Sequence, residues 1–481
     1  MSDFEGDPNI GGIAVWTWGP YSTALAEKMA AQITESAGYV FQEVTQGASY
    51  PGAAQGDPSL ALLATTQQSL LLPENAGPLV TTADTTISGG GAATAIIADA
   101  PLVYSGGATT ILAAGTDEQP ALSQNRITST ADHALVVLGS DVPDQGNTTQ
   151  LTALGGEDTI RIDERRDSAT SVVVSGGHAL VKMDWAGGLG SSFVPVRVNA
   201  AGSHDDTIMA SGADAAIRAG TADTIIAAGQ AVETINAAGG NMFFGRGADA
   251  VFVGGSTANT IFGGAGATTI EGSRQGDLAY AGVGGTRFVG HGNDTIWGSQ
   301  APGTAATIFG FQGAHEMVVD GAAHSQLIGM GAGATLDGAN SDGSLFFFAS
   351  PSAGNETLIG ANTGNGDSFY IGHNTGGHAT ITIENFRDGD RLDLSALTQA
   401  DWHIVSAGMG HDATAFSLTD GTTVQFVNGS INNGGAGGYF FGASNTLAHA
   451  PVAPSSGGYI GGDDGVTLTM GYFPVQAVPV A

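Results

Sequence analysis

The sequence predicts an all-β fold: a right-handed parallel β-solenoid with a short N-terminal cap and a small C-terminal β domain. Three observations predict it. The chain has 77 glycines in 481 residues, its hydrophobic content is 42%, and part of it repeats with a fixed period. The glycine content indicates tight turns at regular places, while the apolar share is too high for a disordered chain. Together they indicate a packed fold that is rich in turns.

The repeat is defined by a polar anchor residue that is followed two positions later by an apolar residue. The anchors fall about nine residues apart, at positions 206, 214, 223, 233, 241, 249, 259, 268, 277, 286 and 294. The apolar residues form the expected core row: Ile208, Ala216, Ile225, Ile235, Phe243, Val251, Ile261, Ile270, Ala279, Phe288 and Ile296. Four residues before each anchor stands a small residue, such as Gly202 or Gly264. This period is too poor in apolar residues for a helix and fits a short strand with a tight turn.

Two such units form one coil of about 18 residues, and weaker copies extend the predicted solenoid over residues 84–383. At about 4.8 Å per coil, 16 or 17 coils would form a rod of about 80 Å. We expect residues 1–83 to form an N-terminal cap and assembly segment, with a helix over about 23–44. Residues 384–481 are expected to form a C-terminal capping domain and a secretion or assembly tail.

The charge and the cysteine content narrow the function classes. Asp and Glu number 45 against 13 for Lys and Arg, a formal net charge of −32, which disfavours binding to nucleic acid or to anionic membranes. The chain has no cysteine, which excludes disulfides and thiolate metal sites. No uninterrupted apolar run is long enough for a transmembrane segment. The N-terminal residues carry no secretory signal pattern, so we expect the chain to be either intracellular or exported by a route that does not read an N-terminal signal.

Part of the repeat resembles the nonapeptide of RTX (hemolysin-type) proteins, G-x-G-x-D-x-U. Two segments carry the pattern: Gly245-Arg246-Gly247-Ala248-Asp249-Ala250-Val251 and Gly290-His291-Gly292-Asn293-Asp294-Thr295-Ile296. Residues 383–395 are similar to the stretch that follows the repeats in such proteins. The resemblance implies a β-roll, folding after export by the type I secretion machinery, and Ca²⁺ held between coils by aspartates and turn carbonyls.

The resemblance assigns candidate Ca²⁺ ligands to the anchors. Because anchors two steps apart share an edge of the solenoid, we expect a few ions where carboxylates adjoin: Asp206 with Asp223, Asp277 with Asp294, and Asp214, Glu233 and Asp249 on the opposite edge. The alternative is that stacked Thr and Asn side chains replace the metal.

We expect no enzymatic activity. His315-Glu316 continues as Met317-Val318-Val319, so the second histidine of a zinc-protease motif is absent, and no serine lies in a G-x-S-x-G motif. The enzymatic alternative is a polysaccharide-acting β-helix, for which the nearest cluster is Asp158, Arg161, Asp163, Glu164, Arg165, Arg166 and Asp167. We interpret this charge run as a solvated loop.

These observations together predict a protein secreted to the bacterial cell surface or medium. Its expected role is structural, as a surface-layer, matrix or filament-forming subunit that associates with copies of itself. The alternative is a calcium-binding adhesin or a module of a secreted system. Self-association is expected because stacked coils end in open strand edges and because both ends of the sequence carry apolar, aromatic segments. The alternative is that these segments cap the solenoid of their own chain.

Overall fold

The computed structural model describes most of the chain between residues 60 and 427. The described ranges are 60–114, 124–140, 148–164, 169–184, 196–211, 214–228, 232–247, 249–299, 306–311, 317–319, 325–341, 344–363, 366–387, 390–393, 404–407 and 415–427, with shorter pieces at 9–10, 13–14, 24–29, 31, 40–44, 304 and 440–441.

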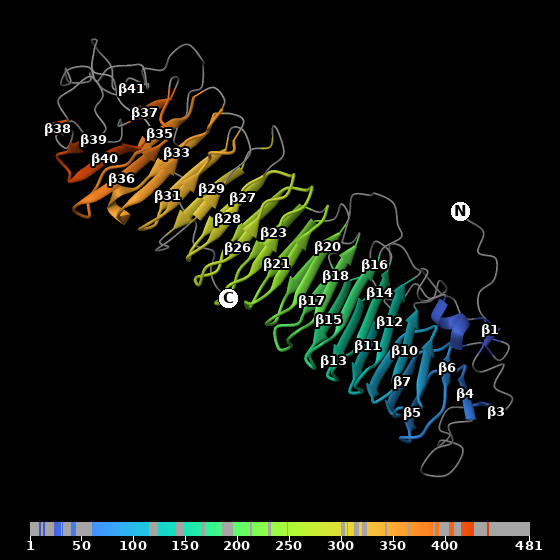
Figure 1. Ribbon diagram of the computed structural model, residues 1–481. Helices are drawn as coiled ribbons and strands as arrows, with labels where there is room; N and C mark the ends of the chain where they lie inside the picture. Colours follow the sequence, from blue (N-terminus) through green and yellow to red (C-terminus); the bar gives the residue numbers. More distant parts are fainter. Residues whose placement is uncertain are drawn as a thin grey trace.

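The protein is a parallel β-solenoid in which successive strands alternate between two sheets (Figure 1). Sheet 1 contains β3(Val40–Glu43), β4(Leu60–Ala64), β6(Leu79–Thr81), β8(Ala95–Ala98), β10(Thr110–Ala114), β12(Leu135–Ser140), β14(Thr159–Glu164), β16(Leu180–Asp184), β18(Thr207–Ser211), β20(Thr224–Ala228), β22(Met242–Gly245), β24(Thr260–Phe262), β26(Leu278–Tyr280), β28(Thr295–Trp297), β30(Met317–Val319), β32(Thr335–Asp337), β34(Glu356–Ile359), β36(Ala379–Glu384) and β40(Thr422–Val427), with β38(Ile404–Ala407) and β39(Ala415–Leu418) at its C-terminal end.

Sheet 2 runs beside it. It contains β5(Gln68–Leu72), β7(Thr85–Gly89), β9(Leu102–Gly106), β11(Gln124–Ser129), β13(Thr148–Ala153), β15(Ala169–Val174), β17(Val196–Asn199), β19(Ala215–Arg218), β21(Val232–Asn236), β23(Asp249–Val253), β25(Thr268–Glu271), β27(Thr286–Gly290), β29(Ala306–Phe311), β31(Gln326–Met330), β33(Phe346–Ala349), β35(Ser368–Ile371), β37(Arg391–Asp393) and β41(Phe440–Phe441). Outside both sheets lie an antiparallel pair, β1(Asn9–Ile10) with β2(Ile13–Ala14), and a 3-10 turn, η1(Pro351–Ala353).

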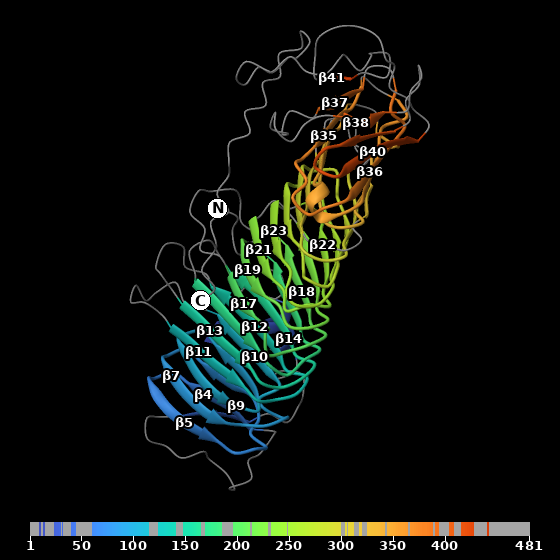
Figure 2. The ribbon, with the colours of Figure 1, turned by 90° about the vertical axis from the view of Figure 1, so that its left-hand side faces the viewer.

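The hydrophobic core fills the space between the two sheets, because every second residue of a strand points inward. Ile225, Phe243 and Ile261 follow one another in register on sheet 1 and are fully buried. Phe243 meets Phe252 of sheet 2 with ring centroids 5.5 Å apart. At about 4.8 Å per step, the ladder from β4 to β40 forms a rod about 80 Å long, which Figure 2 shows from a second side.

The parallel ladder begins before residue 84. β4 pairs with β6, and β5 pairs with β7, both in parallel. Coil length also varies along the chain. Residues paired between coils are 18 apart at Ile225 and Phe243 but 27 apart at Val181 and Ile208. The nine-residue period therefore covers only the coils without added loop residues, and the fold extends further than the period does.

The predicted N-terminal helix is shorter than expected. Residues 24–29 are helical, but Val40–Glu43, at the end of the predicted helix, forms β3 and pairs in parallel with β4. Pairing with a sheet edge therefore decides the structure of residues 40–43, against the local helical pattern. The expected stripe holds at Leu25 and Met29, which are buried.

Antiparallel strands close the C-terminal end of sheet 1. β36 pairs in parallel with β40, and β38, β39 and β40 pair antiparallel in that order. Phe386 packs between Phe369 and Phe426, with centroid distances of 5.7 and 5.1 Å. This is the small C-terminal β structure that the sequence predicts.

In the described part of the chain, helices reach neither the length nor the hydropathy needed to span a membrane.

Candidate functional site

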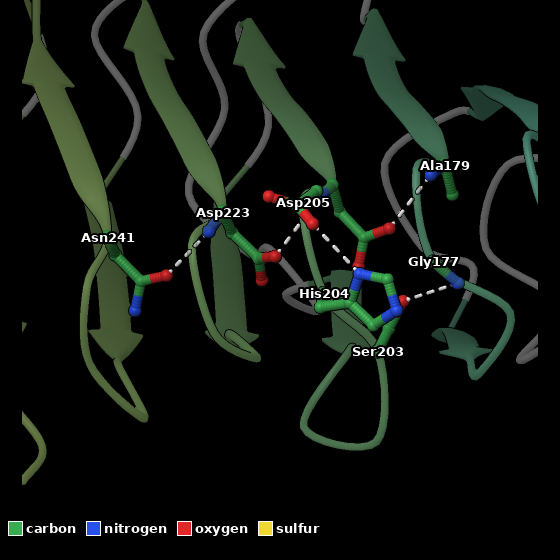
Figure 3. Close-up of polar contacts among 8 residues, drawn as sticks. Gly177, Ala179, Ser203, His204, Asp205, Asp223 and Asn241 are labelled. Atoms are coloured by element: carbon green, nitrogen blue, oxygen red, sulfur yellow. Dashed lines mark hydrogen bonds and ion pairs between the residues drawn. The ribbon is translucent and has the colours of Figure 1, made fainter.

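Six buried Asp and Asn side chains form a column along one edge of sheet 1, each at the residue before a strand. In each step the backbone N–H of one member donates to Oδ1 of the next, over 2.6 to 3.1 Å. The members are Asp206, Asp223, Asn241, Asn259, Asp277 and Asp294. The sequence correctly predicted that these six residues share an edge. Figure 3 shows the step from Asp223 to Asn241.

Similar contacts recur in other coils of the described chain. The N–H of Ala134 donates to Asp158 Oδ1 over 2.8 Å, and that of Ala179 donates to Asp206 Oδ1 over 2.8 Å. On sheet 2, Asp367 N–H donates to Asp390 Oδ1 over 2.7 Å. A buried backbone N–H that lacks a partner is costly, and these side-chain oxygens supply the partners at the corners of the solenoid.

The second carboxylate oxygen of several members accepts from its own turn. Asp223 Oδ2 accepts the N–H of Gly220 over 2.7 Å, and Asp294 Oδ2 accepts that of Gly292 over 3.3 Å. Asp277 accepts the Ser273 N–H with Oδ2 and the Ser273 hydroxyl with Oδ1. Each of these carboxylates therefore joins its own turn to the preceding coil.

Burial shifts the titration of this column. Removal from water, together with a smaller contribution from the neighbouring carboxylate, raises the pKa of Asp223 and of Asp294 to about 6 each. On sheet 2, burial likewise raises the pKa of Asp390 to about 6. Burial also raises the pKa of Asp206 and of Asp158. Hydrogen bonds from backbone N–H groups oppose these shifts but do not cancel them.

Two members of the column, Asp223 and Asp294, do not fit a calcium cage. Calcium takes six to eight oxygen ligands, whereas at Asp223 and Asp294 both carboxylate oxygens already accept N–H groups. The groups facing these oxygens from the preceding coil are N–H donors rather than carbonyls. The geometry suits a hydrogen-bond ladder that holds successive coils together.

The second predicted edge needs correction at Asp214, Glu233 and Asp249. Glu233 pairs with Ala215, and Asp249 pairs with Val232, so these three carboxylates do not share one register position. Their alignment in the sequence is one residue out at 214 and 249, and a slip of one residue turns a side chain to the opposite face. Asp249 is exposed, and its Oδ1 accepts the Ala267 N–H over 2.7 Å.

The same slip corrects the predicted core row. Ala216 and Val251 do not belong to the core, and Val251 is 39% exposed. Ile217 and Phe252 occupy the inward positions in their place, in register with Ile235.

An exposed corner of the solenoid carries histidine and carboxylate side chains on successive turns. His178 and Asp205 adopt left-handed backbone, with φ of 55° and 56°. His204 lies over Gly177, whose lack of a side chain leaves room for the ring, and its Nδ1 contacts Asp205 Oδ2 at 2.9 Å (Figure 3). His178, His204 and Asp205 bring their donor atoms within 4.8 Å of one another. All three residues lie on the surface, and His204 and Asp205 already contact each other, so the geometry alone assigns them no ligand.

The sequence prediction missed an aromatic stack on the outer face of sheet 1. Ring centroids are 5.0 Å apart from Phe244 to Phe262, 5.0 Å from Phe262 to Tyr280 and 4.5 Å from Tyr280 to Trp297, with planes within 4° of parallel. Each ring belongs to the third residue after a column member, as Phe262 follows Asn259. That spacing can be read from the sequence, but the nonapeptide pattern specifies only the inward-facing apolar residue.

The charge run at 158–167 is not simply a solvated loop. Residues 159–164 form strand β14, and Asp158 is buried in the hydrogen-bond ladder. Arg161 lies in register with Val137 and Lys182 on the outer face of sheet 1. Residues 165–167 lie outside the described residues.

Comparison of the sequence with protein-family models, with curated proteins and with solved structures found no match.

Proposed function

We propose that the protein is an extracellular structural subunit, a rigid rod within a surface layer, matrix or filament. The observation that carries the proposal is the parallel ladder, which joins strands from β3 to β40. A continuous ladder of this kind resists bending and stretching, because each coil is hydrogen-bonded to both neighbours.

The polar groups in the interior support the same proposal. The carboxylates of Asp223, Asp277 and Asp294 are buried and hydrogen-bonded to backbone groups. These carboxylates hold successive coils together by accepting backbone hydrogen bonds, as expected of a rod that carries mechanical load. Export by the type I route, which the RTX resemblance implies, is part of the proposal. The absence of cysteine is compatible with an oxidising exterior.

Immunogold electron microscopy tests the location. Antibodies raised against the purified full chain should label the surface of intact cells or extracellular material of the organism that encodes it. A cytoplasmic protein of that organism, labelled in parallel, controls for leakage from broken cells. Label confined to the cytoplasm would contradict an extracellular role.

A further inference from the structure

One row of residues at matching register positions runs along sheet 1 from β4 to β36, and we name it the outer row. Strand register links its members, one per strand. In order they are Leu63, Val80, Ile97, Leu112, Val137, Arg161, Lys182, Met209, Ile226, Phe244, Phe262, Tyr280, Trp297, Val319, Asp337, Ile359 and Glu384.

The first part of the outer row is covered by the chain itself. The N-terminal helical segment at residues 24–29 places Leu25, Ala26 and Met29 against this part of the sheet. Val80, Ile97, Leu112 and Val137 are consequently buried even though they face away from the core. The first part of the outer row is therefore a surface against which an apolar segment of the same chain packs.

The central part of the outer row is also apolar and is partly exposed. It extends from Met209 to Trp297 and includes the aromatic stack. Within the stack, Phe262 and Tyr280 have both ring faces covered by neighbouring rings. Sugars bind aromatic rings through the ring face, so these two rings offer mainly their edges. A continuous ridge of ring edges instead fits the flat face of another sheet.

The opposite face of the same coils is different. The outward residues of sheet 2 include Arg218, Asn236, Glu271 and Arg287, all of them exposed. A second apolar group on sheet 2 lies further along and includes Phe348, stacked on Tyr370 at 5.1 Å. Over the coils of the aromatic stack, the continuous apolar row is thus a property of sheet 1.

Charged residues bound the central part with opposite sign. Arg161 and Lys182 precede it, while Asp337 and Glu384 lie beyond it. A two-fold axis along the solenoid would place each of these charges against its own copy. A two-fold axis parallel to the strands and passing over Phe262 reverses the order of the coils. It then places Lys182 against Asp337 of the partner subunit and Ile226 against Trp297 of the partner subunit.

We propose that two copies of this chain pair face to face through the outer row of sheet 1, with their coils in opposite order. The inference rests on the proposed structural function and names its partner as a second copy. From Lys182 to Asp337 the face is about 38 Å long and about 12 Å wide, given typical strand spacing and rise and strands of three to five residues. That buries about 900 Å² in total, which is the size of a weak interface.

Sedimentation velocity on the full chain, in about 0.3 M salt to screen the repulsion between acidic copies, tests the pairing. The wild type should dimerise in a concentration-dependent manner. Phe262→Lys should raise the dissociation constant by about tenfold or more. Val251→Lys, at an exposed position of sheet 2 on a neighbouring strand, is the matched control and should leave pairing unchanged. Circular dichroism confirms that each variant is folded.

A charge swap tests the register even if Phe262→Lys fails to fold. Lys182→Glu and Asp337→Lys should each weaken pairing about fivefold, because each symmetric dimer contains two such contacts at its rim. The double variant should restore most of the lost affinity. A double variant weaker than both single variants would overturn the proposed arrangement.

Two further results would overturn the pairing itself. One is a wild type that stays monomeric at about 100 µM. The other is loss of pairing in Phe348→Lys while Phe262→Lys still pairs, which would move the contact to sheet 2. Neither result bears on cell-surface labelling, so a failed interface and a failed structural role remain distinguishable.

Discussion

Gly264 stands where no side chain fits, because an added Cβ would lie 1.3 Å from the carbonyl oxygen of Gly245 in the neighbouring coil. At Gly264, which stands four residues before its anchor, the close approach of two backbones thus explains why the residue is small. Gly202 belongs to the same row of small residues, but a Cβ added there would meet nothing within 4 Å. Two glycines that look equivalent in the sequence therefore differ in the fold.

Gly264→Ala should destabilise the protein by about 3 kcal/mol or more, since the clash is with backbone that cannot move without shifting a coil. Gly202→Ala should change stability by about 0.5 kcal/mol at most, or raise it slightly by restricting the unfolded chain. Urea titrations of both variants beside the wild type measure the difference. Equal losses in the two variants would refute close approach as the reason for the glycine.

The buried column shows which residues could be predicted. The period placed Asp206, Asp223, Asp277 and Asp294 on one edge, and the contacts confirm that placement. The period could not specify which atoms their carboxylates face, because that depends on the path of the backbone in the next coil. Asp249 was misplaced because the neighbouring coil differs in length, and a period alone cannot register one added residue.

At the scale of elements, the strands of sheet 1 carry apolar residues on both faces in the coils beside the N-terminal helical segment. Such strands are expected to be covered on both sides. The sequence predicted a helix here, but not its end, because the strand at 40–43 is stabilised by pairing with β4, 20 residues away in the sequence. Local pattern alone cannot contain that information.

Met29→Asp should detach the helical segment from sheet 1, because a carboxylate would be placed in the apolar cluster that includes Val80, Ile97 and Leu112. We expect a loss of about 2 to 4 kcal/mol and increased binding of a hydrophobic dye. Lys28→Asp puts the same side chain on the exposed side of the same segment and should change neither quantity much. Hydrogen exchange should show faster opening of β6 to β12 in the first variant alone.

For the whole molecule, the sequence predicted a rod of about the observed length but not all of its coils. Loop residues added between strands, as between Lys182 and Met209, break the nine-residue period without interrupting the ladder. Hydrogen bonding between coils depends on strand register, and loops at the corners are free to differ in length. The regular coils could therefore be found from the repeat, and the others only from the structure.

The protein should be more stable at pH 5 than at pH 7. Asp223, Asp294 and Asp390 have pKa values of about 6 in the folded chain, above the ordinary value near 3.9. The folded state therefore binds protons more tightly than the unfolded state. The contribution of these three groups to the free energy of unfolding is greatest below their ordinary pKa. It declines as the pH rises through about 6, by about 1 kcal/mol per group between pH 5 and pH 7.

Thermal melts between pH 5 and pH 7.5 measure this dependence. Asp294→Asn keeps an acceptor for the Asp277 N–H, as Asn241 and Asn259 do in the same column, and it removes one titrating group. The variant should therefore show a flatter pH profile. A melting temperature that falls between pH 7 and pH 5 would contradict the raised pKa values. Adding calcium at pH 7 should shift the melting temperature only slightly, because N–H donors already occupy both carboxylate oxygens of Asp223 and Asp294.

The hydrogen-bond column also has a direction. Each coil donates its corner N–H to a side chain of the coil that follows it, as Asp206 does to Asp223. A folded coil therefore presents oriented acceptors to the segment before it. The segment after it must order its own acceptor side chain as it docks, at an additional cost in conformational entropy. Growth of the folded region is thereby expected to be faster from the C-terminal side toward the N-terminal side. The solenoid is a polar template, and its two directions of growth differ in the barrier to docking the next coil.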